Sequence, residues 1–358
     1  MLIDRYIMRE IGKPMLGIST ILVAIFASYR AAGYLADAAA GLLSGTTVLY
    51  LVMLRVAVAL EVLLPTTLYF SVVVALSRMY TDSEITALSS CGISISRVVR
   101  AVLYFSLPLA LLVASLSLYV RPWAYEQSYW LKARAKTKLD MSLWKEDNFY
   151  EVRRMNRVIF ADEIDHKRNR AKGVFIQSDR GDKVQVIYAR EAHQHIDEKT
   201  GGQVILFMNG YLYEFSRIGD EGHIMKFEES TMSLEPPEIE SIGYKRKAAS
   251  PSELAGSDKP EDIAELQWRL STPLATILLA LLGVPLSRTA PRSGRYARVG
   301  TAILIYAVYY NTSAMAKNWV EKGVVGTVPG IWWVDALLAG LLLILLLQPT
   351  LAYWWRRR

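Results

Sequence analysis

Three basic residues lie within or at the ends of long apolar stretches, where a charge is costly and usually has a function. Arg30 lies late in the first stretch, Arg55 early in the second, and Lys317 at the end of the fifth. Because successive stretches would cross a membrane in opposite directions, we expect all three cations near one leaflet. There they could pair with the phosphates of an anionic lipid headgroup. The alternatives are that each side chain extends to the interface or pairs with Glu61 inside the helix bundle.

A second group of residues lies in the polar segment 78–100, RMYTDSEITALSSCGISISRVVR, between two apolar stretches. Thr81 and Glu84 have the spacing of a capping box, and Gly92 suits a left-handed helix end. Between them, apolar residues follow at helical spacing: Ile85, Leu88 and Cys91. The pattern predicts about three helical turns at a membrane surface. This short helix is either a docking element for another protein or a solvated connector.

The sequence lacks the common motifs of enzymes. It has no G-x-x-x-x-G-K-[ST] for phosphate binding, no G-x-S-x-G elbow and no H-E-x-x-H. His193 and His195 could share one face of a strand, but no third or fourth ligand follows at a known spacing, so we expect exposed histidines and no metal. We therefore expect no catalytic residue and no cofactor, and if the protein does work on a substrate, the energy would come from a partner.

The composition indicates a membrane protein with a soluble portion. Of the 358 residues, 52% are hydrophobic and 21% charged, which is too apolar for an ordinary soluble domain. The net charge of +7 would report membrane topology and not nucleic-acid binding. A single cysteine excludes an intramolecular disulfide.

Six apolar stretches are candidate transmembrane helices, preceded by an amphipathic, basic segment 1–13 that we expect to lie in the interface. The stretches cover residues 14–35, 48–76, 98–120, 271–286, 299–315 and 330–348. The expected fold is therefore an α-helical bundle of six transmembrane helices, three on each side of an inserted β domain. The expected domain bounds are 1–121, 122–265 and 266–358.

Lysine and arginine in the short connections set the orientation. Basic residues gather before the first span, after the second, after the fourth and at the end of the chain: Arg5, Arg9, Lys13, Arg78, Arg97, Arg100, Arg288, Arg292, Arg295, Arg298, Arg356, Arg357 and Arg358. The opposite connections carry only Lys317 and Lys322. We expect both termini and segment 78–100 in the cytoplasm, and the soluble domain on the other side. The Arg288–Arg298 loop would be a surface anchor in preference to a second partner contact.

The central portion has the pattern of an antiparallel β domain. Short runs rich in β-branched and aromatic residues alternate with turn signals. The runs are FYEV, RVIFADEI, GVFIQSD, VQVIYARE, QVILFMNGYLYEFS and HIMKFEE. Their spacing of about ten residues suits a sandwich, a jellyroll or an open layer. Segment 235–262, rich in Pro, Ser, Lys and Glu, is expected to be a mobile linker.

Three segments, together with the order of the spans, resemble the LptF/LptG (YjgP/YjgQ) lipopolysaccharide export permease family. They are IDRYIMREIGK, LSRMYTDSEITALSSCGIS and ELQWRLSTPLATILLALLGVPLSRTAPRSGR. The resemblance covers nearly the whole chain. It implies a permease of an ABC transporter in the inner membrane of Gram-negative bacteria, with a periplasmic β-jellyroll. It also implies lipopolysaccharide as ligand. The implied partners are an LptG-like second permease, an LptB-like ATPase dimer and an LptC-like bitopic protein with its own jellyroll.

The same resemblance assigns roles to particular residues. The coupling helix of the family corresponds to residues 80–92, with these positions expected to serve the ATPase: Tyr80, Asp82, Glu84, Ile85, Leu88 and Gly92. Arg30 and Lys317 correspond to basic residues that contact lipopolysaccharide, whereas Arg55 is added from its depth alone. Related sequences can carry another basic residue one turn after Arg30, where this chain has Gly33 and Tyr34. The paired permease would then supply more of the headgroup charge.

Two other functions are compatible with the pattern. One is a mechanotransmission permease, which moves a soluble domain without passing lipid, although four spans are usual there. The other is a membrane-tethered periplasmic scaffold that carries no lipid itself.

Overall fold

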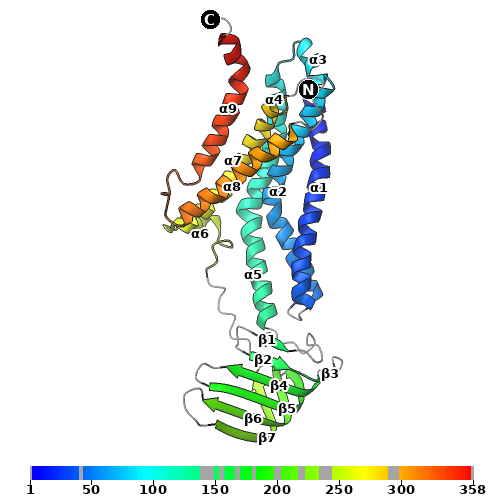
Figure 1. Ribbon diagram of the computed structural model, residues 1–358, viewed down its shortest axis with the longest axis vertical. Helices are drawn as coiled ribbons and strands as arrows, with labels where there is room; N and C mark the ends of the chain where they lie inside the picture. Colours follow the sequence, from blue (N-terminus) through cyan, green and yellow to red (C-terminus); the bar gives the residue numbers. More distant parts are fainter. Residues whose placement is uncertain are drawn as a thin grey trace. The chain divides into compact units, whose positions relative to one another are not determined.

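The computed structural model describes residues 2–39, 43–137, 149–152, 157–165, 170–179, 183–196, 203–216, 222–233, 244–288 and 298–355. The chain forms two compact units (Figure 1). The helical unit comprises Met1–Ala32, Tyr50–Ser128 and Tyr244–Arg358. The second unit comprises Gly33–Leu49 and Tyr129–Gly243 and contains the β-sheet.

The first half of the chain is helical as far as residue 137. Its elements are α1 (Leu2–Ala39), α2 (Gly45–Thr81), α3 (Glu84–Ser90), α4 (Ile95–Ser115), the π-helical segment η1 (Leu116–Val120) and α5 (Arg121–Thr137). Residues 2–13 are helical and continue through Pro14 into the rest of α1 without a break, and the interfacial position of this segment remains a prediction. Ile7 and Ile11 are fully buried in the helical unit, so packing against the bundle holds the start of α1.

The helix that contains the third apolar stretch, residues 98–120, continues well beyond that stretch. The segment η1 connects α4 directly to α5, and the helix runs on to Thr137. A π-helical turn inserts one extra residue into an α-helix and so changes which side chains face a neighbour. Here it orients Ser117 and Arg121 toward the same partner, Glu61.

The second half of the helical unit is built around α7. Its elements are α6 (Pro251–Ala255), α7 (Pro260–Leu286), α8 (Val299–Glu321) and α9 (Trp332–Trp355). Helix α7 packs against α4, α8 and α9, and Leu279 and Leu282 are buried between α2, α8 and α9. The central position of α7 explains why more of its apolar stretch is buried than that of any other candidate span among the described residues.

The expected mobile linker over 235–262 is wrong for its described part, residues 244–262. Ser250 and Glu253 form a capping box at the start of α6. The guanidinium of Arg269 on α7 donates to three backbone carbonyls of the preceding turn, as described below. Residues 235–243 lie outside the described part of the chain.

Within the described residues, four helices are long and apolar enough to cross a membrane: Leu2–Ala39, Gly45–Thr81, Ile95–Ala133 and Pro260–Leu286. Helix α9 contributes a shorter apolar portion, Trp332–Leu347. Helix α8 carries Tyr309, Asn311 and Lys317 among its apolar residues, which lowers its hydropathy. The architecture is that of a multi-pass membrane protein with an inserted β domain, and the count of six spans remains a prediction.

The β domain is one antiparallel sheet, as its alternating pattern predicted. Its strands are β1 (Tyr150–Val152), β2 (Arg157–Phe160), β3 (Glu163–Asp165), β4 (Arg170–Asp179), β5 (Lys183–Ile196), β6 (Gln203–Ser216) and β7 (Gly222–Ser233). The order is β1-β2-β4-β5-β6-β7, with β3 also paired to β4. Ile159, Ile176 and Ile187 lie opposite one another on one face and form the centre of its buried core. Closure into a jellyroll remains a prediction.

An interruption of the pairing runs across the sheet. The register is continuous on both sides of Gly173, Arg190 and Asn209, but these facing positions are not paired. Gly173 and Asn209 have positive φ angles of 59° and 52°. Such positions let strands bend. Gly210 follows directly, and a Cβ there would meet the ring of Phe227 and the carbonyl oxygen of Tyr188.

Candidate functional site

Buried charged side chains join α2, α5 and α7. Arg121, the first residue of α5, donates through Nη1 to both carboxylate oxygens of Glu61 on α2, at 2.8 Å each. Its Nη2 lies 2.9 Å from Oε1 of Glu265 on α7. The side chains of Glu61 and Glu265 are each 1% exposed. Both carboxylates therefore depend on protein partners in place of water.

Glu265 is the centre of this arrangement. Besides Arg121, it binds Nε of Arg269 at 3.2 Å through Oε1, and Nζ of Lys317 at 2.5 Å through Oε2. One carboxylate thus holds cations from α5, α7 and α8. We call the five residues the charge cluster: Glu61, Arg121, Glu265, Arg269 and Lys317.

The π-helical segment adds a hydroxyl to the charge cluster. Ser117 Oγ lies 3.0 Å from Glu61 Oε1 and 3.1 Å from the carbonyl oxygen of Arg269, and its single proton can be donated to either. Without the extra residue of η1, Ser117 and Arg121 would lie at ordinary α-helical spacing along α4 and α5. The local distortion therefore contributes to the site.

Arg269 also fixes the segment that returns to the helical unit. Its side chain is fully buried, and it donates to the carbonyl oxygens of Ala249, Arg246 and Lys247 at 2.9 to 3.3 Å. Each donor nitrogen of the guanidinium has at least one acceptor. A buried arginine so satisfied acts as a rigid connection between α7 and the turn.

Of the three cations expected to meet a lipid, Lys317 belongs to the charge cluster, and Arg55 shares the ring of Tyr125 with Arg121. Lys317 is a member, and its ammonium also lies 5.1 Å from the ring centre of Trp268. Arg55 on α2 lies 4.9 Å from the ring centre of Tyr125 on α5, and Arg121 lies 5.9 Å from the same ring. Lys317 pairs with Glu265 and not with Glu61, the partner named in the alternative prediction.

Arg30 is placed differently. It is exposed on α1, with its guanidinium over the rings of Phe26 and Tyr29 on the same helix. Its contacts recorded among the described residues do not connect it to the charge cluster. An exposed cation on an apolar helix can reach a lipid or a second subunit.

Sequence reasoning identified Glu61 as structural or as a counter-ion, but missed its partner. Arg121 ends an apolar stretch and resembled a boundary residue, whereas Glu265 and Arg269 looked like the polar start of the next stretch. One signal was available, because Glu265 and Arg269 are four residues apart on one helix face. The contact with Arg121 required the tertiary fold.

The segment expected to couple to another protein forms α3, which is shorter than predicted. Thr81 and Glu84 do not form a capping box. Thr81 belongs to the last turn of α2, where its hydroxyl donates to the carbonyl of Ser77 at 2.9 Å. Ser83, with a φ of 60°, precedes α3 without a side-chain cap. Because α2 continues through Thr81, the hydroxyl of this residue bonds within α2 and cannot cap α3.

Glu84 instead contacts the other helices. Its Oε2 accepts a hydrogen bond of 2.8 Å from the hydroxyl of Tyr6 on α1, and its Oε1 lies 3.9 Å from Arg78 on α2. Arg78 is held more closely by Glu10 on α1, at 2.7 Å. The first turns of α1 are therefore tied to both α2 and α3.

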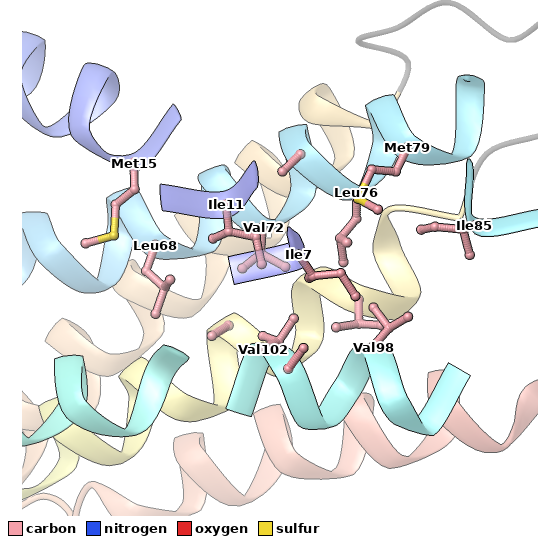
Figure 2. Packing of buried hydrophobic residues seen from close by; sticks show 14 residues of the cluster. Ile7, Ile11, Met15, Leu68, Val72, Leu76, Met79, Ile85, Val98 and Val102 are labelled. Atoms are coloured by element: carbon pink, nitrogen blue, oxygen red, sulfur yellow. The ribbon is translucent and has the colours of Figure 1, made fainter. Parts of the chain in front are cut away.

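Ile85 anchors α3 in the core. It is 3% exposed and belongs to the hydrophobic cluster that Figure 2 shows, near Leu76, Met79 and Val98. Leu88 is half-buried and lines a groove of about 470 Å³ between α1 and α3. The other lining residues are Leu2, Ile3, Tyr6, Glu84, Ala87 and Cys91.

The remaining coupling residues surround this groove. Tyr80 packs against the hydrophobic cluster from the end of α2, and Asp82 is exposed in the turn that follows. Gly92 has a φ of 80°, and the amides of Gly92 and Ile93 donate to the carbonyls of Ser89 and Leu88. The predicted left-handed end of the helix is confirmed at Gly92.

No group of three or more His, Cys, Asp or Glu side chains suited to a metal occurs in the described part of the chain. His193 on β5 lies 3.4 Å from the carboxylate of Glu191. A hollow of about 40 Å³ between α2, α7 and α8 is lined by Pro65, Trp268 and Tyr306, among others. It is large enough for a few water molecules and too small for an acyl chain.

Long apolar helices, an inserted antiparallel sheet and a buried charge cluster define a membrane permease with an inserted β domain. The profile of the family described as lipopolysaccharide export system permease LptF/LptG matches residues 5–348. The chain belongs to this family. It is 26% identical over 360 residues to the lipopolysaccharide export system permease protein LptF of Escherichia coli K12, which covers 98% of this chain and 96% of that protein. The LptF proteins of Escherichia coli O157:H7 and Shigella flexneri match with the same identity and coverage.

Proposed function

We propose that this chain is a permease subunit of an ABC transporter that extracts lipopolysaccharide from the outer leaflet of the inner membrane. The lipid then passes through the periplasmic β domain to a bridge toward the outer membrane. Membership of the export permease family, with a match that covers nearly the whole chain, is the observation that carries this proposal. A separate LptB-like ATPase dimer would hydrolyse ATP, and the other partners would be an LptG-like permease and an LptC-like bitopic protein.

In the proposed topology, α8 and α9 complete six spans, three on each side of the β domain. Both termini and α3 lie in the cytoplasm, and the sheet closes into a jellyroll in the periplasm. The distribution of lysine and arginine in the short connections supports this orientation. Arg292, Arg295 and Arg356–Arg358, which contribute to it, lie outside the described residues.

The proposed lipid site uses Arg30, Arg55 and Lys317 for the phosphates. Arg55 and Lys317 are partly buried among apolar helices, where water competes weakly for an anion. The hollow of about 40 Å³ is too small for the acyl chains, which supports a lipid cavity completed by the second permease.

The proposed coupling element is α3 with the groove beside it. Ile85 anchors α3 in the helical core, so a displacement of α3 would move α1, α2 and α4 with it. Leu88 and Glu84 remain accessible beside the groove, and an apolar side chain with a basic neighbour from the ATPase would fit them.

The test is extraction of lipopolysaccharide from proteoliposomes that contain the complete transporter. Changing Arg30, Arg55 and Lys317 together to Gln should lower photocrosslinking to lipopolysaccharide and its release, while the subunits still copurify. Lys322→Gln is the matched control, because Lys322 is exposed directly after α8. Lys317→Gln is preferred to Lys317→Asp, which would place a carboxylate beside Glu265.

Unchanged crosslinking and release in the triple variant would overturn the headgroup site. A wild-type transporter that assembles and hydrolyses ATP, but neither crosslinks to lipid nor releases it, would favour the mechanotransmission or scaffold function.

A further inference from the structure

We propose that Glu265 is an internal counter-ion that a lipid phosphate displaces from Lys317, so that Lys317 exchanges one anion for another when lipid binds. The inference rests on the proposed function, because it takes Lys317 as a headgroup contact. It adds a positioning role for Glu265, which would keep the Lys317 ammonium in place and neutralised until the lipid arrives.

Lys317 is the member of the charge cluster that a ligand can reach first. Its side chain is 16% exposed, compared with 9% for Arg121, 1% for Glu265 and 0% for Arg269. Its ammonium has three hydrogens, one of which Glu265 takes at 2.5 Å. An approaching phosphate can therefore bind the ammonium before the bond to Glu265 breaks.

The exchange leaves no buried charge unpaired. When Lys317 turns to a phosphate, Glu265 keeps Arg121 at 2.9 Å and Arg269 at 3.2 Å. Removal of a sole partner from a buried ion is strongly unfavourable, but here two cations remain. Arg121 could not exchange so easily, since it provides the guanidinium that binds both oxygens of Glu61.

The balance of charge in the charge cluster also favours an added anion. Three cations, Arg121, Arg269 and Lys317, face two carboxylates, Glu61 and Glu265. Lys317 also lies 3.9 Å from the carboxylate of Glu321. That carboxylate is closer to Arg246, at 3.2 Å, and so does little to neutralise Lys317. A phosphate at Lys317 would supply the missing negative charge in a region of weak screening.

Trp268 reports on the exchange. Nζ of Lys317 lies 5.1 Å from the centre of the Trp268 ring, a cation–π distance. Movement of the ammonium toward a phosphate changes the electrostatic field at the indole, and hence its fluorescence. The difference between the wild type and Trp268→Phe isolates this signal from that of the other tryptophans.

The experiment measures binding of bisphosphorylated lipid A to the full transporter in nanodiscs. Glu265→Gln should raise the affinity by about ten-fold, roughly the equivalent of one charged hydrogen bond that no longer competes. The gain should disappear when Lys317→Gln is added, and with lipid A from which both phosphates have been removed. Glu61→Gln is the comparison variant: it removes one negative charge from the charge cluster without touching Lys317, so it should raise the affinity less than Glu265→Gln does. An equal gain in the two variants would mean that the net charge sets the affinity, and would overturn the exchange.

The readouts separate the exchange from the headgroup site. If the Lys317→Gln variant binds lipid A with the same affinity as the wild type, the headgroup site and the exchange are both overturned. If Lys317→Gln weakens binding but Glu265→Gln gives no gain, only the exchange is overturned. If Glu265→Gln does not assemble, the Trp268 signal decides in the wild-type chain: it should saturate in parallel with lipid binding, and a constant signal would overturn the exchange. An equal Trp268 response to inorganic phosphate would overturn the assignment of the anion to a lipid.

Discussion

The hydroxyl of Tyr6 donates a hydrogen bond of 2.8 Å to Glu84 and so connects the first turns of α1 to α3, across 78 positions of sequence. Glu84 contacts two residues of its own chain, Tyr6 and Arg78, and also lines the groove between α1 and α3. Its charge can serve a partner while one oxygen is held by the chain itself.

The variants Glu84→Gln and Tyr6→Phe separate these roles. Glu84→Gln keeps an acceptor for Tyr6 but removes the charge, and should weaken association with the ATPase by roughly ten-fold, as expected for loss of a charged contact. Tyr6→Phe keeps the charge and should change association by about three-fold or less. Copurification and titration of the ATPase measure both. Normal association of the Glu84→Gln variant would contradict the coupling role.

Ile85 should affect the stability of α3, whereas Leu88 should affect binding of the ATPase. Ile85→Ala removes a buried side chain, at a cost of about 2 to 4 kcal/mol in the packing of α3. Amide hydrogen exchange over residues 84–92 should accelerate. Leu88→Ala should leave exchange nearly unchanged, because Leu88 is half-buried, yet lower ATPase binding. Faster exchange in the Leu88→Ala variant alone would show that the two roles are reversed.

Arg121→Ala should destabilise the helical unit strongly. It leaves Glu61 buried without its guanidinium, and loss of one partner of a buried ion pair costs about 3 to 5 kcal/mol. Thermal unfolding in detergent should show a lower midpoint than for Arg100→Ala, the matched control at an exposed arginine on α4. Equal midpoints for the two variants would mean that water already solvates Glu61.

Gly210→Ala should destabilise the β domain while leaving the helical unit unchanged. A Cβ at position 210 would meet the Phe227 ring and the carbonyl of Tyr188, and a backbone atom cannot move aside without a shift of β5. The expected loss is about 1 to 3 kcal/mol, detected as faster exchange in β5 to β7. Gly222→Ala is the control, since a Cβ there makes only ordinary contacts.

Local composition was enough to predict the apolar helices and the strands. The runs around Ile176, Ile187 and Phe207 alternate as half-buried strands must, and their side chains form the observed core. The left-handed Gly92 was predictable because only its own backbone conformation is involved.

Contacts between distant segments could not be predicted in this way. The predicted capping box at Thr81 is wrong because α2 continues through this residue. The sequence of residues 81–84 alone does not show how far the preceding helix extends. The partner of Glu61 was unpredictable for a similar reason: Arg121 reaches it only after a π-helical turn, and its other partner, Glu265, lies far along the sequence. Helix and strand propensities depend on residues that are close in sequence, whereas a buried ion pair depends on how separate helices pack.

The turn that Arg269 holds also brings the two ends of the β insertion together. Lys247, just after the insertion, lies 5.6 Å from the ring centre of Tyr125, just before it. For the helical chain the whole insertion is thus a loop whose ends already touch, and the entropy of closing such a loop rises only slowly with its length. Replacing the whole insertion by a short glycine-serine linker between its two ends should therefore leave the helical unit folded.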